Sequence, residues 1–257
     1  MIGREGYTLD PDRTFRRQIR LRADGANVTG ELADDAHHFR VTLEHDGAKV
    51  VSLDGNALRH PWSTCPEALS PLRELVGMPL SERATAVGAY SAARRNCTHW
   101  FDLAGLAVAH AASGRTARDY TCAVWGHPQD EVHATLARDG ERLFAWRLVD
   151  DTIHGDPPFD GRSLRGGFLA WAEETLPLDL AEAAIVLRRG CTIGGVRFLD
   201  LDHASHAPDV QIVAGQCHTY TKGTAERAKR MHGSRRDFTR VPGGPLGPTD
   251  EEPSAPA

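Results

Sequence analysis

The sequence predicts an α+β fold, with a largely antiparallel sheet and packed helices. Two observations support this fold class. Strand-like runs occur in groups, and helical patterns follow each group. Asp-Gly dipeptides join neighbouring strand-like runs at Asp46-Gly47 and Asp139-Gly140, and this dipeptide is typical of antiparallel hairpins.

The predicted strands precede each group of helices. We expect strands at residues 15–21, 27–32, 39–43, 49–53, 121–125, 131–136, 143–148, 196–201 and 210–213. A helix over 98–112 is apolar on nearly every side, which is typical of a buried helix, and Gly114 is suited to end it. Apolar residues at helical spacing predict a second helix over 164–176, and a third is expected over 180–189.

A weak internal repeat indicates two similar halves. Residues 42–80 and 135–178 each contain an Asp-Gly hairpin, a proline-containing loop and an amphipathic helix that ends at Pro-Leu. We therefore expect one α+β domain over 13–241, with possible halves 13–115 and 116–241.

The two ends of the chain are expected to lie outside this domain. Residues 1–12 are polar and are expected to be flexible. The tail 242–257 is rich in proline, glycine and acidic residues, and it is expected to be disordered because it has little apolar surface to bury.

Composition and charge exclude several classes of protein. The net charge is −5, which argues against a nucleic-acid partner. No stretch approaches the roughly 18 apolar residues that would span a membrane, and the N-terminus lacks the apolar core of a secretion signal. Five widely spaced cysteines without a CxxC pair exclude a zinc ribbon and disfavour a disulfide framework. We expect a cytoplasmic protein with free thiols.

The first candidate site surrounds the start of the buried helix. The helix N-terminus offers free N–H groups, and Arg94 and Arg95 add positive charge, so a carboxylate or phosphate can bind there. Cys97 is a candidate nucleophile because this position lowers a thiol pKa, and His99 is a candidate acid or base. In the structural alternative, a neighbouring residue caps the helix and Cys97 is a small buried side chain.

The second candidate site follows an early Asp-Gly turn. Glu31, Asp34, His37 and His38 are close in sequence and suit either acid–base chemistry or metal binding. Strand alternation places His37 on the same face as Phe39 and points His38 the other way. A solvated polar turn is the structural alternative.

A divalent metal is the alternative cofactor, whereas the leading hypothesis has none. The candidate ligands are His37, His38, His60 and His99, together with a carboxylate. No spacing in the sequence demonstrates that these side chains meet.

Two further clusters have structural alternatives that we favour. His60, Trp62 and Cys65 lie in a rigid loop that enters a helix, where they would bind substrate or cap the helix. The basic run over 226–238 could bind RNA, but the acidic chain lacks interleaved aromatic residues. A solvated helix face is the preferred interpretation of this run.

Several of these segments together resemble a bacterial family of unknown function, catalogued as domain of unknown function 2889. The likeness covers about residues 13–112. It rests on Asp24-Gly25, Gly30-Glu31-Leu32 with Asp34 or Asp35, Pro61 and Cys65, Leu75-Val76-Gly77, and Cys97-Thr98-His99. The family pattern has Gly before and Leu after the last triplet, where this chain has Asn96 and Trp100. The resemblance implies a shared pocket and no particular reaction.

The leading hypothesis is an enzyme, a lyase or hydrolase, that acts on a small anionic or carbonyl-bearing molecule. Protons would be exchanged between His99 and a carboxylate, Glu31 or Asp34, while Cys97 is either the nucleophile or part of the pocket wall. This hypothesis requires Glu31 and His99 to line one cavity.

The expected binding residues and partners complete the hypothesis. Substrate-binding candidates are Arg94, Arg95, His60, Trp62, Cys65 and His38. We expect a small-molecule substrate and neither a nucleic-acid nor a membrane partner, and a homodimer stays open. A non-catalytic module that binds a small ligand is the remaining alternative, because two similar halves can enclose a cleft.

Overall fold

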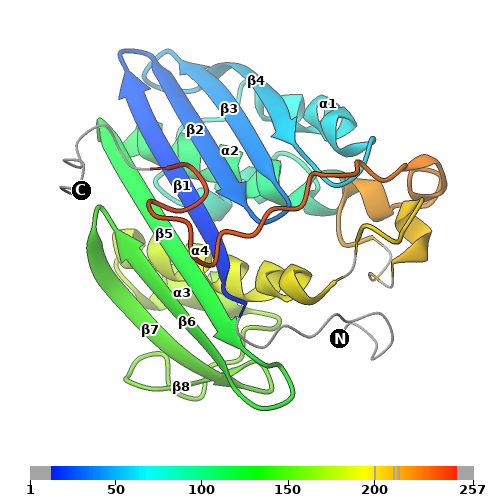
Figure 1. The fold of residues 1–257 in the computed structure, drawn as a ribbon. Helices are drawn as coiled ribbons and strands as arrows, with labels where there is room; N and C mark the ends of the chain where they lie inside the picture. The colour runs from blue at the N-terminus through cyan, green and yellow to red at the C-terminus, as the bar shows by residue number, and fades with distance from the viewer. Residues whose placement is uncertain (1–12, 200, 211, 213–214, 248–257) are drawn as a thin grey trace, which may run out of the picture.

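The computed structural model describes residues 13–199, 201–210, 212 and 215–247. Its eight strands form one sheet in the order β4-β3-β2-β1-β5-β6-β7-β8, with every neighbouring pair antiparallel (Figure 1). The strands are β1 (Phe15–Asp24), β2 (Asn27–Asp34), β3 (His38–His45), β4 (Val50–Arg59), β5 (Ala117–Gly126), β6 (Val132–Arg138), β7 (Glu141–Val149) and β8 (Thr152–His154). The predicted α+β class is confirmed.

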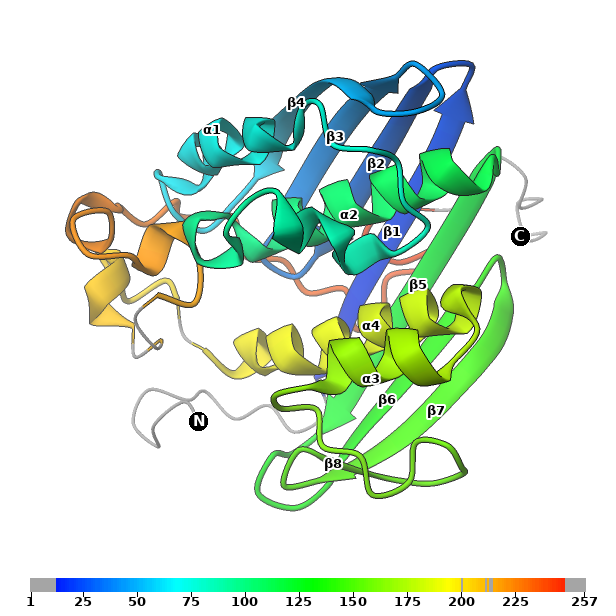
Figure 2. The same cartoon turned by 180° about the vertical axis from the view of Figure 1, so that it is seen from behind.

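Helices cover one face of this sheet (Figure 2). They are α1 (Leu69–Leu72), α2 (Thr98–Ser113), α3 (Phe168–Thr175) and α4 (Leu178–Ile193). The helix α2 packs on β1, β2 and β3, whereas α4 packs on β5 and β6. Among the described residues, no helix is long and apolar enough to cross a membrane.

The buried character of α2 follows from its two-sided packing. The sheet covers one side of this helix, and α1 and a 3₁₀ helix over Ala84–Ala89 pack against it elsewhere. Gly114 ends the helix in the left-handed conformation, with φ of 66°, as its position in the sequence predicts. The predicted helices at 98–112, 164–176 and 180–189 correspond to α2, α3 and α4.

The two halves of the sheet have the same order of elements. Four consecutive strands precede α1 and α2, and four more precede α3 and α4; β1 pairs with β5 where the halves meet. The two Asp-Gly hairpins are not equivalent, however. Asp46-Gly47 joins β3 to β4, whereas Asp139-Gly140 joins β6 to β7, one strand earlier within its half. Their turns also differ, since Asp139 takes a positive φ of 52° and Asp46 does not.

In two predicted strands near the C-terminal end, none of the described residues lies in a strand. Residues of the predicted strand 196–201 belong instead to a 3₁₀ helix over Gly194–Phe198, and Leu199 and Leu201 both line a cavity rather than alternating between two faces. In the predicted strand 210–213, the described residues Val210 and Ile212 are not in a strand.

The basic run over 226–238 is not an exposed helix face. Only a short 3₁₀ helix, Ala225–Arg227, reaches into it. Arg230 is buried, and it donates hydrogen bonds to the Leu201 and Pro61 carbonyls and pairs with Asp202 at 2.7 Å. The run is therefore held in place by buried arginine contacts, a role that its charge alone did not reveal.

Part of the predicted disordered tail lies against the outer face of the sheet. The Leu246 N–H donates to Gln18 Oε1 at 2.7 Å, and Arg20 Nη1 donates to the Leu246 carbonyl at 3.2 Å. Gly244, with φ of 70°, packs directly against the Gln18 side chain, a close approach that glycine permits. Residues 242–247 thus differ from the expectation, while 248–257 and the predicted flexible segment 1–12 lie outside the described residues.

Candidate functional site

A cavity of about 160 Å³ lies at the beginning of α2. Two imidazoles and three thiols line it: His37, His99, Cys65, Cys97 and Cys217. Its apolar wall includes Trp62, Ile193, Val196, Leu199 and Leu201. None of the described lining residues is Lys, Arg, Asp or Glu. A cavity of this size holds a ligand about as large as benzene.

Asp34 anchors the polar end of this site. It stands directly opposite Arg17 in the pairing of β1 with β2, and Arg17 Nη2 lies 2.6 Å from Asp34 Oδ2. Both side chains are buried. The other oxygen, Oδ1, accepts hydrogen bonds from the Ala36 and His37 N–H groups, at 3.0 and 2.9 Å, and so shapes the turn after β2.

Two stacked histidines share the Asp34 carboxylate. His37 Nδ1 lies 2.9 Å from Oδ1, and His99 Nε2 lies 3.7 Å from Oδ2. The two ring centroids are 3.6 Å apart, and the Phe39 ring stacks beyond them. His37 thus shares the face of Phe39, as strand alternation predicts.

Cys97 completes a line of three groups. It is the N-cap residue of α2, and its Sγ lies 3.8 Å from His99 Nδ1. His99 therefore faces the thiol with one ring nitrogen and the Asp34 carboxylate with the other. A nucleophile, a base and an orienting group in this order are typical of thiol catalysis, and such distances are often loose without substrate.

The environment fixes the protonation state of these groups. Burial would raise the pKa of Asp34, but the charges of His37 and Arg17 outweigh it and hold the pKa well below its usual range. Burial, with the nearby His37 and Arg17 charges, lowers the pKa of His99 well below its ordinary value. Burial raises the pKa of Cys97 well above its ordinary value, although the Trp100 and His99 N–H groups oppose this. The predicted lowering of the Cys97 pKa by the helix N-terminus is therefore wrong, because desolvation outweighs it. At neutral pH the site therefore holds a carboxylate, a neutral His99 and a protonated thiol.

The same residues offer the geometry of a metal site. Ligand atoms of Asp34, His37 and His99 all lie within 4.8 Å of one another. However, both Asp34 oxygens already accept hydrogen bonds, and the Arg17 guanidinium sits beside them. A cation would have to displace these donors and lie next to a buried positive charge, so the donor set fits a metal poorly.

The other predicted metal ligands do not join this cluster. His38 lies on the opposite face of the sheet, where its Nε2 is 2.6 Å from Glu31 Oε1. His60 is half-buried, with Nδ1 2.9 Å from the Trp62 carbonyl oxygen. The predicted set therefore contributes only His37 and His99.

The structure contradicts the pairing of Glu31 with His99. Glu31 and Asp34 are three residues apart on β2, so their side chains point to opposite faces of the sheet. Glu31 contacts His38 and Arg40 on the face away from α2, with Arg40 Nη2 at 3.1 Å. Neither Glu31 nor His38 lines the cavity.

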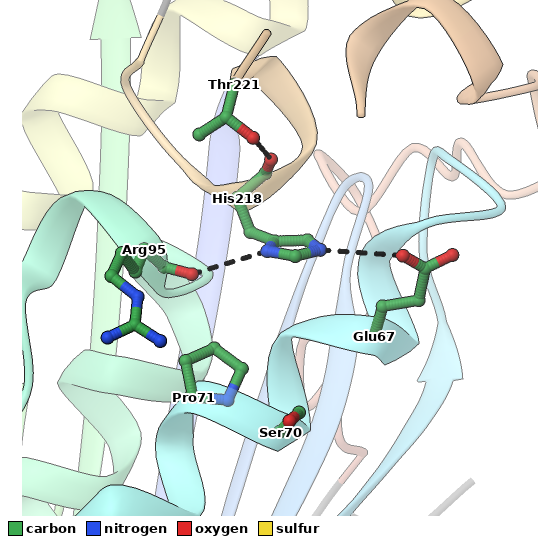
Figure 3. Close-up of a pocket in the computed structure, with 6 residues that line it drawn as sticks. All are labelled: Glu67, Ser70, Pro71, Arg95, His218 and Thr221. Carbon is green, nitrogen blue, oxygen red and sulfur yellow. Dashed lines mark hydrogen bonds and ion pairs between the residues drawn. The ribbon is translucent and has the colours of Figure 1, made fainter. Parts of the chain in front are cut away.

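The two predicted anion-binding arginines also lie elsewhere. Arg94 and Arg95 belong to a short 3₁₀ helix, Ala93–Arg95, and both side chains are exposed. Arg95 Nη2 pairs with Glu74 at 2.8 Å. Arg95 lines a separate surface hollow of about 500 Å³ with Glu67, Ser70, Pro71, His218 and Thr221 (Figure 3).

Five of the predicted site residues line the cavity: His37, Trp62, Cys65, Cys97 and His99. Asp34 contacts the cavity through His37 and His99. Sequence reasoning missed Arg17 and Cys217. The sequence around Arg17 did carry information. Arg17 lies between Phe15 and Ile19 on the buried face of a strand, where a charged residue is unusual.

A family model matches the N-terminal part of the molecule. Residues 13–113 match the family described as Protein of unknown function (DUF2889). The resemblance noted in the sequence is therefore confirmed. The DUF2889 segment spans β1 to α2, and it includes Asp34, His37, Cys97 and His99, whereas Cys217 lies beyond it. No curated protein matches the chain.

Proposed function

We propose that this protein is an enzyme of the hydrolase type that acts on a small carbonyl-bearing molecule. In this proposal Cys97 is the nucleophile, His99 is its base and Asp34 orients His99. The contacts from Cys97 Sγ through the two ring nitrogens of His99 to Asp34 Oδ2, at 3.8 and 3.7 Å, support the assignment.

At rest the pair is a neutral imidazole and a protonated thiol, and both pKa shifts disfavour proton transfer between them, so in this proposal the transfer is coupled to attack on the carbonyl. A neutral His99 can accept a proton at Nδ1, and the Asp34 carboxylate favours the tautomer that carries hydrogen on Nε2. Because burial keeps Cys97 protonated, the thiol would lose its proton only as it attacks the substrate. This differs from a site that stores a preformed thiolate.

The proposed reaction has two stages. The Cys97 sulfur attacks the carbonyl carbon while its proton passes to His99 Nδ1, and the N–H groups at the start of α2 stabilise the oxyanion. The intermediate collapses to a thioester when the leaving group departs with the proton from His99. Water then attacks the thioester, His99 accepts a proton from that water, and the acid is released as the proton returns to the Cys97 sulfur.

The cavity favours a small uncharged substrate over an anionic one. Apart from the two imidazoles and a few polar groups, the described lining is apolar, and Arg94 and Arg95 face away from it. A buried anion without a cationic partner would be strongly destabilised. We therefore place carbonyl compounds with a compact apolar group first.

Acetylation by p-nitrophenyl acetate tests the proposal. We expect a burst of nitrophenol and an acetyl group on Cys97, both lost in Cys97→Ser. Cys65→Ser is the matched control, since Cys65 is a buried thiol of the same cavity, and it should keep the burst. Acetylation of another residue, or equal rates in both variants, would overturn the assignment and favour a pocket that binds ligands without catalysis.

We also propose a cytoplasmic location. The five cysteines are all free, as is expected of a protein kept in a reducing compartment. Fractionation of the producing cells would test this proposal, and recovery of the chain outside the cytoplasmic fraction would contradict it.

A further inference from the structure

A second thiol lies across from Cys97. The chain around Cys217 runs beside the start of α2, where the 3₁₀ helix His218–Tyr220 approaches it. In Figure 2 this orange segment lies next to the first turn of α2. Cys97 and Cys217 both line the cavity.

Two hydrogen bonds bracket this pair of cysteines. On one side, the His218 N–H donates to the Asn96 carbonyl at 3.0 Å. On the other side, Thr98 Oγ1 donates to the Gln216 carbonyl at 3.4 Å. One backbone bond and one side-chain bond thus hold residues 216–218 beside residues 96–98, and Cys97 and Cys217 are the middle residues of these two stretches.

The backbone at both cysteines is extended. Cys97 has φ of −70° and ψ of 126°, and Cys217 has φ of −153° and ψ of 173°. Disulfides need a Cα separation of about 4.4–6.8 Å. The hydrogen bond between the neighbouring residues His218 and Asn96 holds the two backbones close together at this point.

Cys65 is the competing partner in the same cavity. It begins the 3₁₀ helix Cys65–Ala68, and its Sγ lies 3.7 Å from Thr219 Oγ1. No described backbone hydrogen bond pairs the chain around Cys65 with the chain around Cys97. The backbone hydrogen bond from His218 to Asn96 therefore favours Cys217 over Cys65 as the partner of Cys97.

We propose that Cys97 and Cys217 form a reversible disulfide when the protein meets a peroxide. The Cys97 sulfur attacks one peroxide oxygen while His99 takes the thiol proton, and that proton leaves with the other oxygen as water, which gives a sulfenic acid. The Cys217 sulfur then attacks the Cys97 sulfur, and the sulfenic oxygen leaves with the Cys217 proton as a second water. Two thiols are oxidised to one disulfide while hydrogen peroxide is reduced to two waters.

The disulfide would consume the Cys97 thiol and would also close the site. Neighbouring side chains of the same segments face outward into the surface hollow, where the His218 ring lies between the Arg95 carbonyl and the Glu67 carboxylate (Figure 3). These segments thus form the wall between hollow and cavity. A covalent link from Cys217 to Cys97 would fix that wall to α2. The loss of activity on oxidation rests on the proposed function, whereas formation of the link does not.

Peptide mapping of the oxidised full-length chain tests the proposal. The protein is treated with hydrogen peroxide, its remaining thiols are alkylated under denaturing conditions, and the digest is analysed by mass spectrometry. We expect one linked peptide pair containing Cys97 and Cys217, which disappears on treatment with dithiothreitol. Cys65, Cys122 and Cys191 should be recovered alkylated.

Two serine variants sharpen the result. Cys65→Ser should still form the linked pair. Cys217→Ser should lose it, and Cys97 should then be trapped by dimedone as the sulfenic acid. A link between Cys65 and Cys97, or sulfinic acid at Cys97 in wild type without any link, would overturn the proposal. Because this mapping needs no turnover, its failure is distinguishable from failure of the esterase test.

Discussion

The strands β1, β2 and β3, with the turn between β2 and β3, carry two clusters of the same chemical groups on opposite faces of the sheet. Toward the helices, Asp34 binds His37 and Arg17; away from them, Glu31 binds His38 and Arg40. The contact distances are similar, but Asp34 is fully buried and the Glu31 side chain is 21% exposed. We call these the inner and outer clusters.

Burial, rather than the types of residue present, distinguishes the inner cluster from the outer one. The inner carboxylate is held ionised against a large desolvation penalty, and its histidines border a cavity with a thiol. The outer cluster lines no cavity among the described pockets, and solvent screens its charges. A carboxylate, an imidazole and a guanidinium can therefore lie a few residues apart with different consequences.

The largest expected difference concerns thiol reactivity. His99→Gln should slow alkylation of Cys97 by iodoacetamide at neutral pH about 10²–10⁴-fold, because the variant lacks the base beside Sγ. The matched outer variant, His38→Gln, should react at the wild-type rate. Alkylation is followed by mass spectrometry of the Cys97 peptide. Equal rates in the two variants would show that His99 does not act as the base.

The second-largest expected difference between the clusters concerns the free energy of unfolding. Asp34→Asn leaves the buried Arg17 without its counter-charge, and breaking a buried ion pair in this way costs about 3–5 kcal/mol. Glu31→Gln removes a partly exposed pair and should cost less than about 1 kcal/mol. Urea unfolding gives both free energies. If the two variants lost the same stability, burial would not be the difference between the clusters.

A third prediction contrasts Asp34 with its neighbour Asp35. Burial, reinforced by the Asp34 charge, raises the pKa of Asp35 from 3.8 to about 7, although Arg13 opposes it. Between these pH values the folded state holds a proton that the unfolded state has lost. The stabilisation is therefore complete below pH 3.8 and is lost as the pH rises through about 7.

The Asp35→Asn variant makes this loss measurable, because asparagine does not titrate. The free energy of unfolding of wild type, relative to the variant, should fall by about 1.4 kcal/mol per pH unit across that window. Urea unfolding at a series of pH values from about 4 to 8 measures the slope. A constant difference would mean that Asp35 keeps an ordinary pKa in the folded protein.

The face of the sheet on which each side chain lies could be predicted from the sequence, because side chains alternate along a strand. It correctly separated His37 from His38. Applied along β2, the same rule places Glu31 and Asp34 on opposite faces, so the expectation that either carboxylate could meet His99 ignored information already in the spacing. The family resemblance also treated both acids as members of one pocket.

Contacts between distant segments could not be predicted in this way. Arg17 meets Asp34 only because β1 pairs with β2 in one register, and the segment around Cys217 meets the segment around Cys97 from 120 residues further along the chain. The class of fold followed from local patterns of strands and helices. The wrong strand prediction at 196–201 shows the limit of such local patterns. In the sequence, leucines that line a cavity have the same spacing as leucines that alternate on a sheet.

The smallest expected effect concerns salt, and it bears on the outer cluster alone. At about 1 M NaCl the screening length falls to about 3 Å, so the attraction of Glu31 for Arg40 and His38 should largely vanish. The destabilisation by Glu31→Gln, already below about 1 kcal/mol, should then approach zero. The Asp34→Asn penalty should persist, since solvent ions do not reach Arg17 in the buried pair. Urea unfolding of each variant beside wild type, with and without salt, measures this, and equal salt sensitivity would place both clusters in the same solvent environment.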